Sequence, residues 1–229
     1  MLASERVENM ASPPLEHGMN LDSLIENPSP KARMLLNKAL EFMTHTKDPS
    51  HGIEHLVHLI KNTERFFKST GDQFDIDKEI LLLALYWHDV WKSQNRVRVR
   101  NYLFHQWYEG LGSMLMFKKH ARTAGLPQRT ERAVSYAIRK HSALASFPAM
   151  TLEARLLWDV DTLDLWNSQR IQAIFKNLEH APIFFLDAYL LYMKKRGAHL
   201  YFDWTKKEVE RIKPFFFEEM ASCRESLVR

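Results

Sequence analysis

The chain has 229 residues, of which 45% are hydrophobic and 26% are charged, and its formal net charge is +4 at pH 7. This length is enough for one sizeable core, and so small an excess of Lys and Arg suits an anionic substrate or a merely soluble surface. The single cysteine, Cys223, excludes an internal disulfide framework and a cysteine-based zinc site.

The first thirty residues differ from the rest of the chain. They are polar, they contain four prolines, and they lack the basic-then-apolar pattern of a secretory signal. We therefore predict an extended or weakly ordered arm over residues 1–30. Nowhere does an apolar run reach the roughly 18 residues of a membrane-spanning helix. The expected location is cytoplasmic, with no membrane partner.

From residue 31 to residue 229, apolar residues recur at helical spacing, and the whole chain has only seven glycines. Asp48-Pro49 predicts a helix start and Gly71 its end, and a strongly apolar helix then runs to about Trp91. A capping box is predicted at Thr205. Further helices are predicted at 102–124, 127–141, 151–163, 168–179, 182–196 and 205–226. The predicted fold class is a single all-α domain over residues 31–229.

Three short stretches carry most of the chemical information. Ser50–His55 reads Ser-His-Gly-Ile-Glu-His, Tyr86–Asp89 reads Tyr-Trp-His-Asp, and a later acidic stretch contains Asp159 and Asp161. Together they form a His…His-Asp…Asp pattern of nitrogen and oxygen ligands, which suits a divalent metal. The pair His88-Asp89 follows a helix too apolar to lie on a surface, so its burial would be costly without a partner such as a metal.

These stretches resemble the signature of the HD-domain metal-dependent phosphohydrolase superfamily over roughly residues 51–165. The resemblance rests on Ser50–His55, on Leu85–Val90, and on Asp159–Asp164, which is similar to the family's Asp-x-Asp-x-Leu-Asp segment. Ala137–Ser142 resembles a segment of the nucleotide-hydrolysing branches. The resemblance implies an HD-type helical bundle that uses a divalent metal to hydrolyse a phosphate ester of a nucleotide or a related small molecule.

Carried over residue by residue, the resemblance implies four metal ligands: His55, His88, Asp89 and Asp161. Such ligands admit Mn, Mg, Co, Ni, Fe or Zn. A second ion stays open, and the candidates near it are His105, Glu109, His120 and His141. His51 lies one turn before His55, and we assign it a role beside the metal or at the substrate phosphate, with a purely structural role as the alternative. Asp159 is expected to support the ligands from outside the set.

Catalytic roles are assigned to Asp89, His51 and Lys92, and substrate-binding roles to His51, Lys92, Arg96 and His141. Lys92 and Arg96 belong to a basic stretch over residues 92–100 that can hold phosphate oxygens, although a solvated loop explains it equally well. Several branches of the family carry an acidic residue shortly after the His-Asp pair. None follows His88-Asp89 here. A carboxylate from another helix would have to serve as general base, unless none is needed.

Two other functions fit the same pattern. The missing acidic residue also suits a catalytically silent HD domain that binds a nucleotide and regulates, and some relatives of this fold hold two irons and use oxygen. The expected partner is a small phosphorylated substrate, with a nucleotide preferred. Dispersed basic residues and the lack of a recognition motif argue against nucleic acid. The sequence is compatible with a homo-oligomer.

Overall fold

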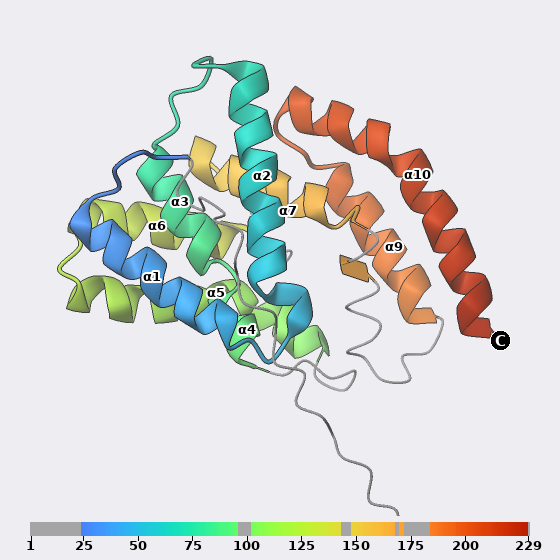
Figure 1. The fold of residues 1–229 in the computed structure, drawn as a ribbon, viewed down its shortest axis with the longest axis horizontal. Coiled ribbons are helices and arrows are strands. Elements are labelled where there is room, and N and C mark those ends of the chain that lie inside the picture. Colours follow the sequence, from blue (N-terminus) through green and yellow to red (C-terminus); the bar gives the residue numbers. More distant parts are fainter. Residues whose placement is uncertain (1–23, 96–101, 143–147, 168–169, 172–183, 229) are drawn as a thin grey trace, which may run out of the picture.

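The computed structural model describes residues 24–95, 102–142, 148–167, 170–171 and 184–228. Throughout these residues the regular elements are helices, so the predicted all-α class is confirmed (Figure 1). The elements are α1 (Pro30–Thr44), the short 3-10 helix η1 (Pro49–His51), α2 (Ile53–Thr70), α3 (Lys78–Trp87), α4 (Val90–Gln94), α5 (Tyr102–Thr123), α6 (Gln128–Lys140), α7 (Leu152–Asp164), α9 (Phe184–Gly197) and α10 (Asp203–Val228). Among them, none is both long and apolar enough to cross a membrane.

Local side chains explain where several helices begin and end. Ser29 caps α1 by accepting a hydrogen bond from a backbone N–H at 3.2 Å, and Asp77 and Thr151 cap α3 and α7 in the same way. The chain leaves α2 at Gly71, whose φ of 56° strains any residue with a Cβ. The predicted start at Thr151 and the predicted end at Gly71 are confirmed.

Two helices predicted as continuous are interrupted in the structure. The helix expected from Asp48 begins with η1, and Gly52 then adopts an extended backbone before α2 starts. His51 therefore lies on η1 and not one turn earlier on the face of α2, which corrects the prediction. The apolar helix expected to reach Trp91 ends at Trp87, and a two-residue turn, His88-Asp89, separates α3 from α4.

Other boundaries differ by smaller amounts. The last helix begins at Asp203, two residues before Thr205, which therefore does not cap it. The arm predicted over residues 1–30 falls mostly outside the described residues, although Leu24 is buried and α1 starts at Pro30. The helix predicted over 168–179 also lies outside the described residues, apart from 170–171.

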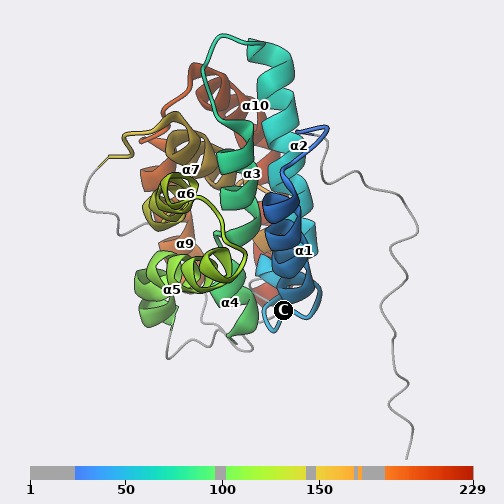
Figure 2. The same ribbon diagram turned by 90° about the vertical axis from the view of Figure 1, so that its left-hand side faces the viewer.

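Two apolar clusters meet at α7. The first joins α1, α2, α3, α5, α6 and most of α7, and the second joins the end of α7 to α9 and α10. Figure 1 shows α9 and α10 beside α2 and α7, with the other helices on the far side of α2; Figure 2 gives the view at right angles. Every residue from Leu81 to Trp87 is buried, so α3 carries the His-Asp pair into the interior.

Candidate metal centre

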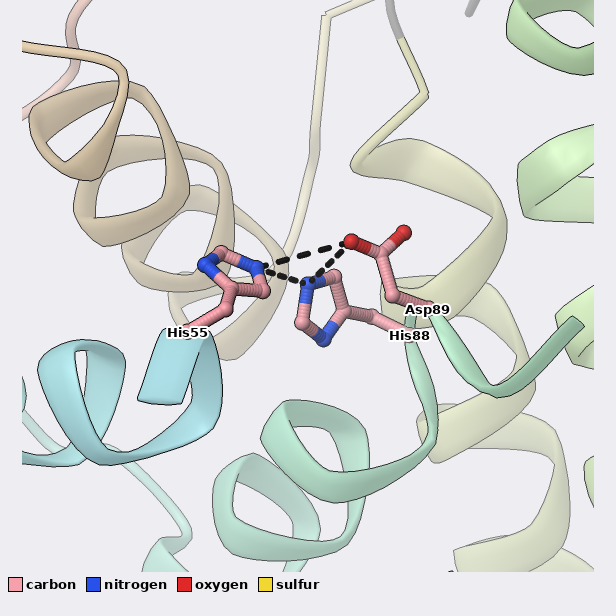
Figure 3. A group of neighbouring side chains, drawn as sticks. All are labelled: His55, His88 and Asp89. Atoms are coloured by element: carbon pink, nitrogen blue, oxygen red, sulfur yellow. Dashed lines mark hydrogen bonds and ion pairs between the residues drawn. The ribbon is translucent and has the colours of Figure 1, made fainter. Parts of the chain in front are cut away.

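Three helix ends bring two imidazoles and a carboxylate together (Figure 3). His55 lies in the first turn of α2, His88 follows the last residue of α3, and Asp89 precedes α4. The Nε2 atoms of His55 and His88 are 3.1 Å apart, and Asp89 Oδ2 lies 3.5 Å and 3.3 Å from them. All three residues are buried, and their ligand atoms are close enough to hold one metal ion.

The turn between α3 and α4 makes this arrangement possible. Neighbouring side chains on a continuous helix point about 100° apart, so His88 and Asp89 could not both face one ion from the middle of a helix. Asp89 leaves the helical conformation, with φ −112° and ψ 9°. As a result its carboxylate comes back beside the imidazole of His88.

The hydrogen bonds on the far sides of the two rings decide which nitrogens face the cluster. His55 Nδ1 donates to Asp164 Oδ2 at 2.7 Å, and His88 Nδ1 donates to the carbonyl oxygen of Leu85 at 2.8 Å. With these tautomers, each ring presents an Nε2 lone pair to the other. Two lone pairs cannot bond to each other, whereas a cation between them satisfies both. The residues present therefore fit a divalent metal.

Asp161, the fourth predicted ligand, borders the cluster and is held by two arginines. Its Oδ1 lies 3.6 Å from His55 Nε2 and 3.2 Å from Arg170 Nη1, and its Oδ2 lies 3.0 Å from Arg196 Nη2. Burial alone would raise the pKa of Asp161, but the two guanidinium groups hold that pKa well below its ordinary value. The carboxylate is therefore ionised and available to a metal.

Buried charge around the cluster also fits a divalent cation. Five buried carboxylates surround it: Asp48, Asp89, Glu109, Asp161 and Asp164. Three buried cations stand against them: Lys92, Arg170 and Arg196. The carboxylates outnumber the Lys and Arg side chains by two, and this excess of buried negative charge suits a bound cation. One oxygen, Asp89 Oδ1, is buried and accepts no hydrogen bond within the described residues.

A second row of polar groups runs from η1 to α5. His51 Nδ1 donates to Asp48 Oδ2 at 2.9 Å, His51 Nε2 lies 3.3 Å from Lys92 Nζ, and Lys92 forms an ion pair with Glu109. Burial and the Lys92 charge lower the pKa of His51, so its ring is neutral and accepts from the ammonium. His51 Nε2 is also 3.7 Å from Asp89 Oδ2. The row therefore touches the metal cluster.

The ammonium of Lys92 stays charged in this row despite its burial. Burial opposes the charge, but Glu109 and Asp89 raise the pKa of Lys92 above its ordinary value. The alternative that Lys92 belongs to a solvated loop is therefore wrong, because its side chain is buried on α4. Arg96, the other predicted phosphate contact of this stretch, lies outside the described residues.

The other three candidate histidines, His105, His120 and His141, have different surroundings. His141 Nε2 lies 3.5 Å from Asp89 Oδ1, and its Nδ1 donates to the carbonyl oxygen of Ile138, so its Nε2 also faces the cluster. Burial lowers the pKa of His141, but the neighbouring carboxylate of Asp89 raises it above its ordinary value. His105 is buried against the ring of Trp91. His120 is not a candidate ligand, because its ring packs against the core aromatics Phe42 and Trp87.

Asp159 does not support the ligands as expected. Its carboxylate accepts hydrogen bonds from the backbone N–H groups of Tyr201 and Phe202, at distances of 2.9 to 3.2 Å. It therefore ties α7 to the segment before α10. Burial raises the pKa of Asp159 to about 7, although these hydrogen bonds lower it.

Sequence reasoning assigned no role to Asp164, Arg170 or Arg196. Asp164 orients His55, and its position three residues after Asp161 on one helix was a signal that could have identified it. Arg196 donates to Thr162 Oγ1 at 3.0 Å as well as pairing with Asp161. No motif surrounds either arginine, so nothing in the sequence pointed to them.

Comparison with known proteins supports the fold. No family model matches the sequence, and no curated protein matches it significantly. The structure is similar to the crystal structure of a predicted HD superfamily hydrolase from an uncultured Thermotogales bacterium, with a TM-score of 0.58 and 20% sequence identity. The match covers 91% of this chain and 99% of that chain. The resemblance inferred from the His…His-Asp…Asp pattern is thus confirmed for the fold, because the chain shares the all-helical fold of this predicted HD superfamily hydrolase.

Proposed function

We propose that the chain is a metal-dependent hydrolase that cleaves a phosphate ester of a nucleotide or a related small molecule. One observation carries the proposal: two buried imidazoles present their Nε2 atoms to each other at 3.1 Å beside the buried carboxylate of Asp89. The similar structure is itself described as a predicted hydrolase, which agrees with the proposal. Nitrogen and oxygen ligands of this kind are typical of hydrolytic metal sites.

The cluster residues would hold the metal, and their supports fix how they do so. His55, His88 and Asp89 form the core of the ligand set, with Asp161 Oδ1 beside them. A divalent ion bound there would polarise a phosphoryl oxygen and provide a water nucleophile near neutral pH. Because Asp164 holds the ring of His55, that ring keeps one tautomer and one orientation.

Buried cations beside the ligands would bind the phosphate group. Lys92 is a charged ammonium next to the cluster, and Arg170 Nη1 already bonds to Asp161 and Asp164. Arg170 Nε is buried and has no hydrogen-bond partner among the described residues. It is therefore a donor that a phosphate oxygen can satisfy. These groups would also balance charge that develops on the phosphate during hydrolysis.

His51 is the residue best placed to move a proton. Asp48 holds its Nδ1–H, so the unprotonated Nε2 points toward Lys92 and Asp89. An imidazole oriented by a carboxylate can accept a proton from water. This arrangement would replace the acidic residue that is missing after His88-Asp89. Glu109 is a carboxylate from another helix that could serve the same task, and it shares Lys92 with His51.

A second candidate function is supported by His141. Its Nε2 and Asp89 Oδ1 are both buried without a hydrogen bond in the described part of the chain, and they lie 3.5 Å apart. With Asp89 as a bridge, these atoms could help to hold a second ion. Two ions would suit either hydrolysis or the oxygen chemistry of a di-iron site.

The proposed function is tested by metal analysis of the protein as isolated, followed by a screen of nucleoside mono-, di- and triphosphates with several divalent ions. We expect His88→Ala and Asp89→Ala to lose the metal and the activity while keeping the helical circular dichroism spectrum. The exposed His199→Ala variant is the matched control and should keep both. Full activity in both site variants would refute the ligand assignment.

Other outcomes of the same experiment select the alternatives. Nucleotide binding without turnover in the metal-loaded protein would identify a silent, regulatory domain. Two irons per chain, together with a product that forms only in the presence of oxygen, would identify an oxygenase. Hydrolysis of a phosphate ester that depends on the added metal would support the proposal.

A further inference from the structure

A cavity of about 280 Å³ lies between α2, α7 and α10, and none of the residues that line it belongs to the proposed ligand set. Its charged and polar walls come from α2 and α10, and the end of α7 closes it. Its lining includes His58, Lys61, Arg65, Asp164, Trp166 and Glu208. These three helices pack against one another, so the cavity belongs to the folded body of the protein (Figure 1).

Basic groups that line the cavity or pair with its carboxylates outnumber those carboxylates. Glu208 is already paired with Arg65 and with Arg211. Asp164 accepts hydrogen bonds from His55 and Arg170, at 2.7 Å and 3.0 Å. Each carboxylate of the lining is thus shared by two basic groups. The exposed ammonium of Lys61 makes no ion pair with any described residue, so it is available to an incoming anion.

The volume of the cavity and its apolar wall indicate which kind of anion would fit. The volume is near the lower limit of about 300 Å³ for small-molecule sites, which suits a compact ligand. The rings of Trp166, with Leu163 and Ile212, provide an apolar wall. We propose that this cavity binds a small organic anion with a phosphate or phosphonate group, and that Asp164 links it to the metal centre.

The link rests on the two oxygens of one carboxylate. Asp164 Oδ2 bonds to Nδ1 of His55, whose other nitrogen faces the metal cluster. Asp164 Oδ1 lies 3.3 Å from Nδ1 of His58, which lines the cavity and whose Nδ1 is also 2.7 Å from the amide nitrogen of Asn167. An anion that draws His58 away from Asp164 removes one contact of this carboxylate and strengthens its hydrogen bond to His55, which favours metal binding. By linkage, the metal must then favour the anion by the same factor.

Calorimetric titration with phenylphosphonate tests the site, because hydrolysis of phosphate esters does not break a phosphorus–carbon bond. The expected result is binding by the wild type, a loss of about tenfold in affinity in Lys61→Ala, and unchanged affinity in Lys38→Ala, an exposed lysine paired with Glu41 on α1. Asp89→Asn, which disrupts the metal cluster, should still bind the probe. The titration reads binding alone, so its outcome is independent of whether the protein is a hydrolase.

Two outcomes would overturn the site. One is that the wild type does not bind phenylphosphonate. The other is that Lys61→Ala binds it as the wild type does, while Asp89→Asn does not, because the probe would then occupy the metal centre. The link is tested by measuring Mn²⁺ affinity with and without the probe. At saturating probe we expect about a fivefold gain in the wild type and a smaller gain in His58→Ala; equal gains in the two proteins would show that the contact between His58 and Asp164 does not connect the sites.

Discussion

Replacing Asp164 tests whether the carboxylate behind His55 controls metal affinity. Its Oδ2 accepts from His55 Nδ1 at 2.7 Å and from Arg170 Nη1 at 3.0 Å, and both partners are buried. Without this acceptor, the imidazole of His55 loses the bond that fixes its tautomer and orientation. Loss of such a support costs about 10- to 100-fold in metal affinity, which is about 1.4 to 2.8 kcal/mol. We expect Asp164→Ala near the upper end, and Asp164→Asn, which keeps an oxygen acceptor but not the charge, near the lower end.

The assay is a titration with Co²⁺ or Zn²⁺ in competition with a chelator of known affinity, at neutral pH. Asp203→Ala is the matched control, because Asp203 is an exposed aspartate on α10 that pairs only locally with Lys206. Circular dichroism and urea unfolding would show that the variants keep the fold. Metal affinity equal to that of the wild type in a folded Asp164→Ala protein would refute the reasoning.

Two further predictions concern the support of the site. A Cβ on Gly112 would lie 2.5 Å from Trp91 Cγ, so we expect Gly112→Ala to lower the free energy of unfolding by about 1 to 3 kcal/mol in urea denaturation. Gly197→Ala is the control: its Cβ would have its nearest contact at 3.6 Å, so the free energy of unfolding should change by less than about 0.5 kcal/mol. Helix propensity alone would make Gly112→Ala more stable by about 1 kcal/mol, and that result would contradict the packing argument. Acid should also destabilise the protein through Asp48: burial opposes its charge, but His51 and Ser50 hold the pKa of Asp48 below the ordinary 3.8 of the unfolded chain. The stability it contributes is present above pH 3.8 and is lost as the pH falls toward the folded pKa, because the unfolded chain takes up the proton first. Urea unfolding in chelator should therefore show a smaller acid slope for Asp48→Asn than for the wild type, and identical slopes would count against this assignment.

Most helices could be predicted from the sequence because local chemistry sets their limits. The predicted helices at 102–124, 127–141 and 151–163 agree with α5, α6 and α7 to within one residue at each end. In each case apolar periodicity is bounded by a proline, a glycine or a capping threonine. The two interruptions were missed. Gly52 is a poor helix former and was the available signal for the first, but the turn at His88-Asp89 follows an unbroken apolar pattern.

Only part of the candidate site could likewise be predicted from the sequence. His55, His88 and Asp89 could be found because residue types that suit a metal occur next to a helix that must be buried. Arg170 and Arg196 could not, because their pairing with Asp161 depends on how α7, α9 and the intervening chain come together. The burial of Lys92 likewise depends on Glu109, which lies on a different helix. Contacts between distant segments leave no periodic trace in a single sequence.

The two-residue turn between α3 and α4 also limits how the length of this chain can vary. One inserted residue would lengthen this turn and displace α4 relative to α3. The side chain of Trp91 would then leave the space opposite Gly112, and the ammonium of Lys92 would swing away from Glu109. Insertions elsewhere in the surface connections can be absorbed by loops, but at this junction a single added residue would disturb the ligand pair and its basic neighbour together.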